Sequence, residues 1–431
     1  MVLLACVPSI QTRAQTVSST GKAVRHVRVE EESSWPPELT QAESSIEKKD
    51  YTAAEPLLRK VIDRDPTNYL AWYDLGFVLN ALGKPEESIA AYRKSVAAKP
   101  DVFESNLNLG LMLAKNGQPG AAQFLRAATT LKPTANVDEG RARVWLSLAH
   151  VLESAKPDEA IEAYRQAAQL KPKDPEPHLA AAPLLEKQNR FAEAEHEYQA
   201  ALNLNAASAD ALTGLANLYM RGNRFNDAEA VLRKLVALQP NDAGAHMQLG
   251  RMLAASGDND QSIVELQAAL KLAPGDTDLQ QDLAAVYADA RKYPEAEAQY
   301  RALVSGKPRD AELHFRLGQA LLNQKKFPDA QQELLTAVQL KPDLGLAYGD
   351  LAVAANENQN YELAIKALDA RARLLPEIPA GYFLRATAYD HLHDRKQAAE
   401  NYHRFLETDG GKNPDQEWQA RHRLIAIEPK K

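Results

Sequence analysis

The chain has 431 residues, a length at which a globular protein would ordinarily form two to four domains. Its net charge of −7 provides no basic surface for nucleic acid, which proteins bind mostly by neutralising phosphates. A single cysteine excludes an intrachain disulfide, and no apolar run reaches the roughly 18 residues that a membrane-spanning helix needs.

The first 34 residues differ in composition from the rest of the chain. Residues 2–7 are apolar, but the stretch is short for a signal peptide and no basic residue precedes it. We interpret residues 1–34 as an export-signal remnant and a disordered linker, which favours an exported or periplasmic location over a cytoplasmic one. Residues 3–6 are also similar to a lipoprotein cleavage box, which would make Cys6 a lipid anchor. An apolar disordered tail is the alternative.

Residues 277–310 predict two short amphipathic helices followed by a stop. Ala284 and Tyr287 fall on one face of the first helix, and Ala296 and Tyr300 fall on one face of the second. The proline near the end of the stretch cannot continue a helix. The stretch is therefore a helical hairpin with a defined end.

The same hairpin recurs, with a spacing of 34 residues over most of the chain. A small residue marks the middle of each first helix: Ala42, Gly76, Gly110, Ala149, Ala182, Ala216, Gly250, Ala284, Gly318, Ala352 and Ala386. Leucine or tyrosine marks each second helix: Leu58, Tyr92, Leu125, Tyr164, Tyr198, Leu232, Leu266, Tyr300, Leu334, Leu368 and Tyr402. The repeats cover 35–68, 69–102, 103–135, 142–174, 175–208, 209–242, 243–276, 277–310, 311–344, 345–378 and 379–412.

This period and these columns resemble the tetratricopeptide repeat family, as found in bacterial scaffold proteins. The resemblance implies an all-α fold, a superhelical solenoid of about eleven helix–turn–helix repeats. Residues 413–431 would add a capping helix and a tail, in which Trp418, Ala420, Leu424 and Ile425 form the apolar face. In this family the first helices line a concave groove.

Three places depart from the regular pattern. Pro56 lies inside a predicted second helix and is expected to delay its start. Pro183 lies well inside a first helix, which it should kink or shorten. Residues 134–141 are extra and polar, so we expect a surface loop there; a bend or an added contact near the groove is the sharper alternative.

No catalytic or metal-binding constellation stands out in the sequence. His391 and His393 form the closest histidine pair, and His150, His178, His246 and His314 are interpreted as scaffold residues. We therefore expect no metal, no cofactor and no enzyme activity. An enzyme that uses a polar patch near Arg251 is a minor alternative.

Function is then expected on the groove surface of the first helices. Candidate binding residues are apolar toward both ends and polar in the middle: Tyr73, Phe77, Leu107, Leu111, Leu146, Thr213, Asn217, Arg251, Gln281, Phe315, Val353 and Phe383. The predicted partner is a protein or peptide segment bound without covalent chemistry. A non-catalytic subunit of envelope assembly or polysaccharide export machinery is the alternative. The apolar candidates could instead pack against neighbouring first helices.

Overall fold

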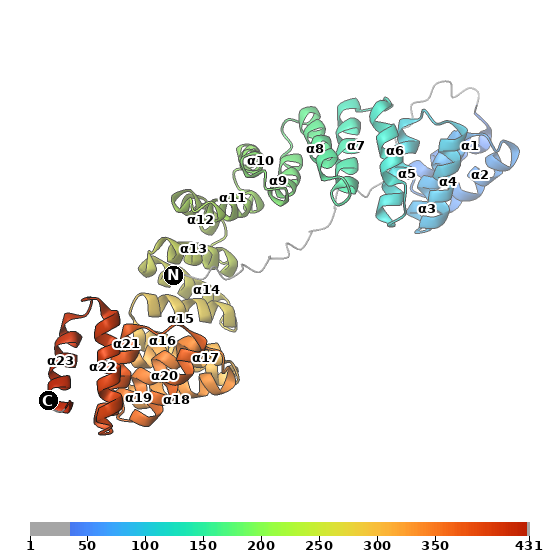
Figure 1. The fold of residues 1–431 in the computed structure, drawn as a ribbon. Helices are drawn as coiled ribbons and strands as arrows, with labels where there is room; N and C mark the ends of the chain where they lie inside the picture. Colours follow the sequence, from blue (N-terminus) through green and yellow to red (C-terminus); the bar gives the residue numbers. More distant parts are fainter. Residues whose placement is uncertain (1–34, 429–431) are drawn as a thin grey trace. The chain divides into compact units, whose positions relative to one another are not determined.

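The computed structural model describes residues 35–428, and every regular element in this range is an α helix (Figure 1). Helices and turns alternate from α1 to α23, so the predicted all-α solenoid of helix–turn–helix repeats is confirmed. The proposed export-signal remnant, the linker and Cys6 lie outside the described residues. The chain divides into two compact units, one ending at Leu218 and the other beginning at Tyr219. Each unit is described by itself.

In the N-terminal unit, consecutive helices pack on one another from α1 to α10, and α5 also touches α7. Packing only between neighbours is typical of a repeat solenoid. The helices are α1 Pro37–Glu47, α2 Tyr51–Arg64, α3 Tyr69–Ala81, α4 Pro85–Ala98, α5 Phe103–Lys115, α6 Ala121–Thr130, α7 Val137–Leu152, α8 Pro157–Leu170, α9 Glu176–Lys187 and α10 Phe191–Leu204. The boundary between the units falls inside α11, Ala209–Arg221.

In the C-terminal unit, consecutive helices pack from α12 to α23, and three pairs of first helices, α13 with α15, α17 with α19 and α19 with α21, are also in contact. The helices are α12 Phe225–Leu238, α13 Ala243–Ser256, α14 Asn259–Leu272, α15 Thr277–Asp289, α16 Tyr293–Gly306, α17 Ala311–Asn323, α18 Phe327–Leu340, α19 Gly345–Glu357, α20 Tyr361–Leu374, α21 Pro379–His391, α22 Arg395–Asp409 and α23 Pro414–Ile427.

The two sequence columns meet inside each hairpin. Gly76 faces Tyr92 so closely that a β-carbon there would lie 2.8 Å from the ring, and a β-carbon at Gly318 would lie 2.6 Å from Leu334. The small residue lets the two helices approach, and the large one fills the space beside it. Ser88 adds a hydrogen bond, because its hydroxyl donates to the carbonyl oxygen of Gly76 at 2.7 Å.

Short polar side chains start several helices. Asp242, Asp276 and Asp310 accept hydrogen bonds from backbone N–H groups in the first turns of α13, α15 and α17, which confirms the predicted N-caps. Asp50 caps α2 in the same way, through the N–H of Ala53. Helix α2 therefore begins at Tyr51 even though it contains a proline.

Three local predictions need correction or refinement. The predicted delay at Pro56 is wrong, because the cap at Asp50 starts α2 ahead of the proline. Pro183 lies inside α9, which runs without interruption over 12 residues. The predicted loop at 134–141 is also wrong over most of its length, because α7 begins at Val137.

The early start of α7 has a physical cause in the neighbouring repeat. The buried carboxylate of Glu104 accepts hydrogen bonds from the Thr134 backbone N–H at 2.9 Å and from its hydroxyl at 2.7 Å. Asp138 and Glu139 lie in the first turn of α7, where negative charge favours a helix. The extra residues thus extend a first helix to 16 residues.

The terminal helix α23 begins at Pro414 and covers only part of the last repeat. Ala420 and Leu424 are buried in a cluster with Tyr402 and Phe405. Trp418 is 61% exposed and Ile425 is more exposed still, so these two do not belong to the buried face. The predicted apolar face of α23 is therefore only half correct.

Candidate partner-binding face

Five apolar candidates for the groove are buried and form part of the core: Tyr73, Leu107, Leu111, Leu146 and Phe315. Leu107, with 0% of its surface exposed, packs in one cluster with Leu111 and Leu146. Large apolar side chains on consecutive first helices fill the space between those helices. The prediction that these five side chains are open to a partner is therefore wrong. The alternative prediction, that they pack against neighbouring first helices, describes them better.

The other candidates are more accessible. Phe77, Thr213, Arg251 and Phe383 are half-buried, whereas Asn217, Gln281 and Val353 are exposed. Phe77 packs edge-on against Tyr51 with ring centroids 6.1 Å apart, and Phe383 packs against Phe405 at 5.1 Å. Both aromatic rings therefore already have partners within the chain, although part of each remains open.

Two polar contacts join consecutive first helices of the C-terminal unit. Arg251 on α13 donates from Nε to Asp282 on α15 at 2.5 Å. Gln319 on α17 donates from Nε2 to Asp350 on α19 at 2.9 Å. We call the surface of α13, α15, α17 and α19 that carries these contacts the first-helix face.

The two carboxyl groups on this face are unusual. Burial raises the pKa of Asp282, and the nearby Arg251 guanidinium only partly opposes that increase. Burial likewise raises the pKa of Asp350, against the hydrogen bond from Gln319. Carboxyl groups with raised pKa values destabilise the folded state when they are charged, and such groups gather at functional sites.

Apolar side chains flank Asp350 on the same helix. Leu346 is 63% exposed and Val353 is 38% exposed. The three residues lie at positions i, i+4 and i+7 of α19, which places them on one side of the helix. Gly349, next to Asp350, has no side chain that could cover Leu346 or Val353. The first-helix face thus offers an apolar stripe with a carboxylate in its middle.

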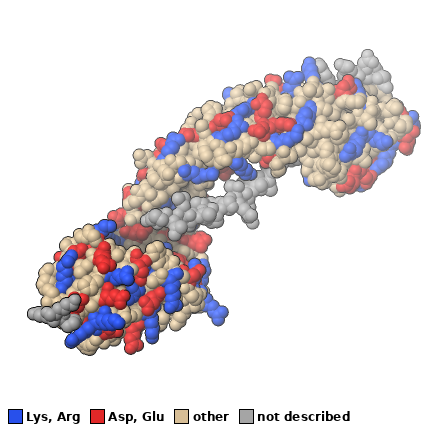
Figure 2. All heavy atoms as spheres, in the orientation of Figure 1, with Lys and Arg blue, Asp and Glu red and all other residues tan. Residues whose placement is uncertain are grey.

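The charged side chains around this stripe are mostly acidic. The first helices contribute Asp278, Asp282, Glu312 and Asp350, together with Arg251 and Arg316. The side chain of Arg371 adds a third guanidinium group, because its Nε would lie 3.4 Å from a β-carbon at Gly349, next to Asp350. Arg316 is itself paired with Glu312 at 2.9 Å. Figure 2 shows one side of the molecule, on which Lys and Arg are interspersed with Asp and Glu within each unit.

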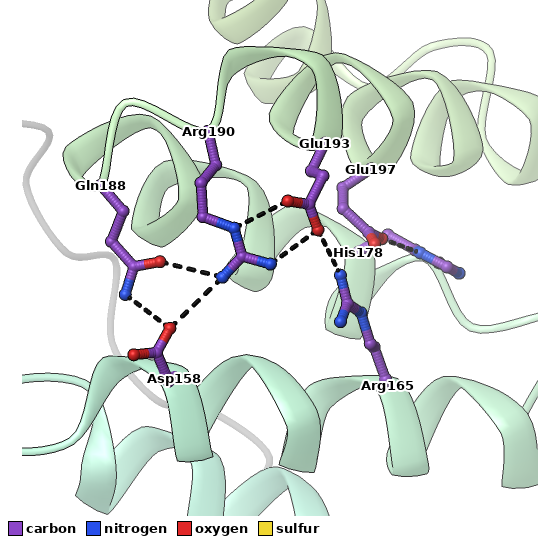
Figure 3. A network of polar contacts seen from close by, with 7 residues as sticks. All are labelled: Asp158, Arg165, His178, Gln188, Arg190, Glu193 and Glu197. Atoms are coloured by element: carbon purple, nitrogen blue, oxygen red, sulfur yellow. Dashed lines mark hydrogen bonds and ion pairs between the residues drawn. The ribbon is translucent and has the colours of Figure 1, made fainter.

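The second helices carry a polar seam that the sequence did not reveal. Arg165 on α8 pairs with Glu193 on α10 at 2.8 Å, and Arg190 bridges Glu193 and Asp158 (Figure 3). Arg301 and Asp329 repeat the first of these pairs in the C-terminal unit. The spacing of 28 residues between the paired side chains is the signal that could have found it. Because these charges satisfy one another, the seam links repeats and is a weak candidate for a partner site.

Three of the repeated histidines each bond a glutamate of the same hairpin. The bonds join His178 to Glu197, His246 to Glu265 and His314 to Glu333, at 2.6 to 2.7 Å and always 19 residues apart. This confirms the interpretation as scaffold residues. Among residues 35–428, no group of three or more His, Cys, Asp or Glu side chains is arranged to hold a metal ion.

His150 differs from the other three histidines. Its Nδ1 lies 2.6 Å from the Tyr164 hydroxyl and 3.1 Å from Glu153, and its Nε2 lies 3.9 Å from Glu176. Burial lowers the pKa of His150, but the two carboxylates raise it more, to about 9. The side chain is therefore a cation held inside an acidic cluster at neutral pH.

Within the described residues, no helix is both long and apolar enough to cross a membrane.

Comparison with known protein families identifies the class of protein. Family models for the tetratricopeptide repeat together match more than half of the chain, at residues 39–103, 81–136, 141–174, 186–251, 243–276 and 282–345. The chain belongs to the tetratricopeptide repeat family.

Among curated proteins, the chain is similar to tetratricopeptide repeat protein 37 of Xenopus laevis, with 32% identity over 80 residues. That match covers 19% of this chain and 5% of the relative. The chain is also similar to protein O-mannosyl-transferase TMTC3 of Mus musculus, with 21% identity over 184 residues. This match covers 40% of this chain and 20% of the relative. The chain thus spans a twentieth and a fifth of these relatives.

Among solved structures, two show a partial likeness to this chain. The structure of YrrB, described as a TPR protein with an unusual peptide-binding site, has a TM-score of 0.40 and 24% identity, covering 43% of this chain and 96% of YrrB. The structure of Naa15/Naa10 bound to HypK-THB has a TM-score of 0.44 and 14% identity, covering 89% of this chain and 64% of that one.

Proposed function

We propose that this protein is a non-catalytic scaffold that binds a segment of another protein on the first-helix face of its C-terminal unit. The observation that carries the proposal is the accessible apolar pair Leu346 and Val353 on either side of Asp350, a carboxyl group whose pKa is raised by partial burial. A carboxyl group with a raised pKa does not stabilise the fold when it is charged. Its presence on this face therefore favours a role in binding.

The charge of this face selects the kind of partner. Four carboxyl groups against three guanidinium groups leave an excess of one negative charge, which favours a segment that carries lysine or arginine. A cation that docks beside Asp350 would lower its pKa toward the ordinary range and would remove the cost of the buried charge. The partner segment is therefore basic at the point where it meets α19.

The apolar stripe selects a second property of the partner. Leu346 and Val353 are accessible on either side of Asp350, so side chains that flank the basic residue should be apolar. Burial of exposed leucine and valine contributes roughly 25 cal/mol per Å² of apolar surface. A helix or an extended strand with apolar residues around a central lysine or arginine satisfies both requirements.

The proposal is tested by crosslinking and affinity capture from the native organism, with mass spectrometry as the readout. The full chain is compared with a variant that combines Leu346→Asp and Val353→Asp. The matched control is Val264→Asp on α14, because Val264 is 62% exposed and belongs to a second helix. All variants are first checked for native helical content by circular dichroism.

We expect a partner that is captured by the wild type and by the Val264 variant but not by the double variant. Peptides that cover the crosslinked region of that partner should be basic and should bind Asp350→Asn more weakly than wild type. Equal capture by all three proteins would contradict the proposal and would exclude this face.

A further inference from the structure

The C-terminal end of the molecule contains a second candidate site, separate from the first-helix face defined above. A hollow of about 630 Å³ lies between α21 and α23, a size in the range of small-ligand pockets. Phe383 and Trp418 supply aromatic surface to its lining. Trp418 is 61% exposed although it belongs to a helix that closes the solenoid. Closing elements of repeat proteins usually present a polar outer surface, so an open tryptophan there is unexpected.

The single carboxylate in the lining is already neutralised. Asp390 accepts two hydrogen bonds from Arg423, at 2.6 and 2.7 Å, and the Tyr402 hydroxyl lies 3.4 Å away. The bonds from Arg423 hold the pKa of Asp390 below its usual value. Asp390 is therefore a fixed part of the wall and offers no free negative charge to a ligand.

Apart from Asp390 and the phenol of Tyr402, the ionisable side chains of the lining are imidazole groups and one guanidinium group. His391, His393 and His422 surround the hollow together with the half-exposed Arg423. His391 is held in place by a parallel stack on Tyr361, with ring centroids 4.5 Å apart, and His422 packs on Trp418 at 3.8 Å. These groups can donate hydrogen bonds to an acidic ligand, and apart from Asp390 no carboxylate lines the hollow to repel one.

We propose that this hollow binds an acidic segment of a partner protein through a large aromatic or aliphatic anchor. The anchor would cover the indole of Trp418 and the accessible edge of Phe383, and flanking carboxylates would meet the imidazoles and Arg423. The site thus differs from the first-helix face, because its one carboxylate is already paired with Arg423. It goes beyond the proposed function and does not depend on it.

The test is a selection of peptides from a displayed library of random 12-residue sequences on the immobilised full chain. Selected peptides are synthesised with a fluorescent label, and their affinities are measured by fluorescence anisotropy. Trp418→Ala and His422→Ala remove parts of the site, and both positions are exposed, so the fold should survive. Ile425→Ala is the matched control, because Ile425 is an exposed apolar residue of the same helix that does not line the hollow.

We expect the selected peptides to be acidic, with one aromatic or large aliphatic residue near the middle. Trp418→Ala should weaken their binding about tenfold or more, as is usual for a tryptophan at the centre of an interface. His422→Ala should weaken binding less, and Ile425→Ala should leave it unchanged. The Leu346→Asp, Val353→Asp double variant should also bind normally, which separates this site from the first-helix face.

Three results would overturn the proposal. One is that no selected peptide depends on Trp418, and another is that the dependent peptides are basic. The third is self-association: if light scattering gives a dimer mass for the wild type and a monomer mass for Trp418→Ala, the occupant is a second copy of the chain.

Discussion

The first helices of both units bury large apolar side chains, Phe315 in the C-terminal unit included, but helix α19 of the C-terminal unit also leaves two of them exposed. In the N-terminal unit, Tyr73, Leu107 and Leu146 are buried within clusters of the hydrophobic core. In the C-terminal unit, Leu346 and Val353 stay exposed, beside a glycine at position 349. The exposure of an apolar residue in a repeat protein is therefore decided by the neighbouring helices. The same residue type can belong to the core in one unit and to a surface in the other.

The two units also differ in how fully their charged groups are compensated by neighbouring groups. The N-terminal unit surrounds the cation of His150 with Glu153 and Glu176, so these half-buried charges stabilise one another. The C-terminal unit holds Asp282 and Asp350 with pKa values raised by burial, and only part of that cost is offset by Arg251 and Gln319. This contrast supports a structural interpretation of the first cluster and a binding interpretation of the second.

The prediction with the largest expected effect tests the difference in burial between Leu107 and Val353. Leu107→Ala should lower the free energy of unfolding by about 2–5 kcal/mol, because it removes buried methyl groups and leaves a cavity. Val353→Ala should change it by no more than about 0.5 kcal/mol, as is usual at the surface. Urea unfolding followed by circular dichroism measures both. Equal losses would mean that Val353 is covered and that the comparison between the units fails.

The second prediction concerns the pH dependence of the N-terminal unit. The pKa of His150 in the folded protein, about 9, lies above its ordinary value of 6.5. The stabilisation by His150 should therefore be complete below about pH 6.5 and disappear as the pH rises through about 9, an effect on the order of 2 kcal/mol. The difference in unfolding free energy between wild type and His150→Gln, measured from pH 6 to pH 10, checks this.

A direct measurement complements that comparison. The ring protons of His150, assigned by NMR through their loss in His150→Gln, should titrate with a midpoint near 9. A midpoint near 6.5 would show that Glu153 and Glu176 do not hold the cation, and the cluster would lose its structural interpretation.

The third prediction tests the cost of the half-buried carboxyl group of Asp350 in the C-terminal unit. Asp350→Asn keeps the size of the side chain and an acceptor for Gln319, but removes the charge. At pH 7 its unfolding free energy should be unchanged or higher by up to about 1 kcal/mol, because the pKa of Asp350 is raised. For the same reason, the contribution of Asp350 to wild-type stability should become more favourable as the pH falls through its folded-state pKa.

Asp390→Asn is the matched control for that substitution. Arg423 lowers the pKa of Asp390, so loss of this charge should reduce stability, by about 1 kcal/mol. A stability loss at Asp350 as large as that at Asp390 would show that both carboxyls are structural, and the binding interpretation of Asp350 would be wrong.

The sequence predicted the hairpins well because their packing is repeated. A small residue such as Gly318 and a large one such as Leu334 recur with the period, so the pattern itself encodes the contact. The accessible face was harder to predict, because exposure depends on side chains of neighbouring repeats. Asp282 and Asp350 were not selected as site residues, since each is paired with a residue 31 positions earlier, outside the 34-residue period.

The extension of α7 shows a second limit of sequence interpretation. The polar composition of residues 134–141 is typical of a loop. The segment nevertheless begins a helix, because Glu104 of the preceding repeat holds Thr134 through two hydrogen bonds. A buried carboxylate 30 residues away decided the local structure, and local propensity cannot register such a partner.

The smallest expected effect concerns the turns that close the first helices. Gly83 in the N-terminal unit and Lys325 in the C-terminal unit both adopt a left-handed backbone, with φ of 74° and 59°. Glycine adopts this conformation without strain, whereas a residue with a β-carbon does not. Lys325→Gly should therefore raise the unfolding free energy by up to about 1 kcal/mol, and Gly83→Ala should lower it by about 1 kcal/mol.

Thermal unfolding of the two variants beside wild type measures both changes. Because the substitutions are opposite, a shift of the same sign in both would contradict the assignment of these turns to one backbone conformation. Changes of opposite sign would show that the turn at Lys325 retains strain that the turn at Gly83 avoids. Glycine is the residue that usually occupies such a turn. A lysine that remains there at a cost in stability would then be the next surface side chain to test for contact with the partner.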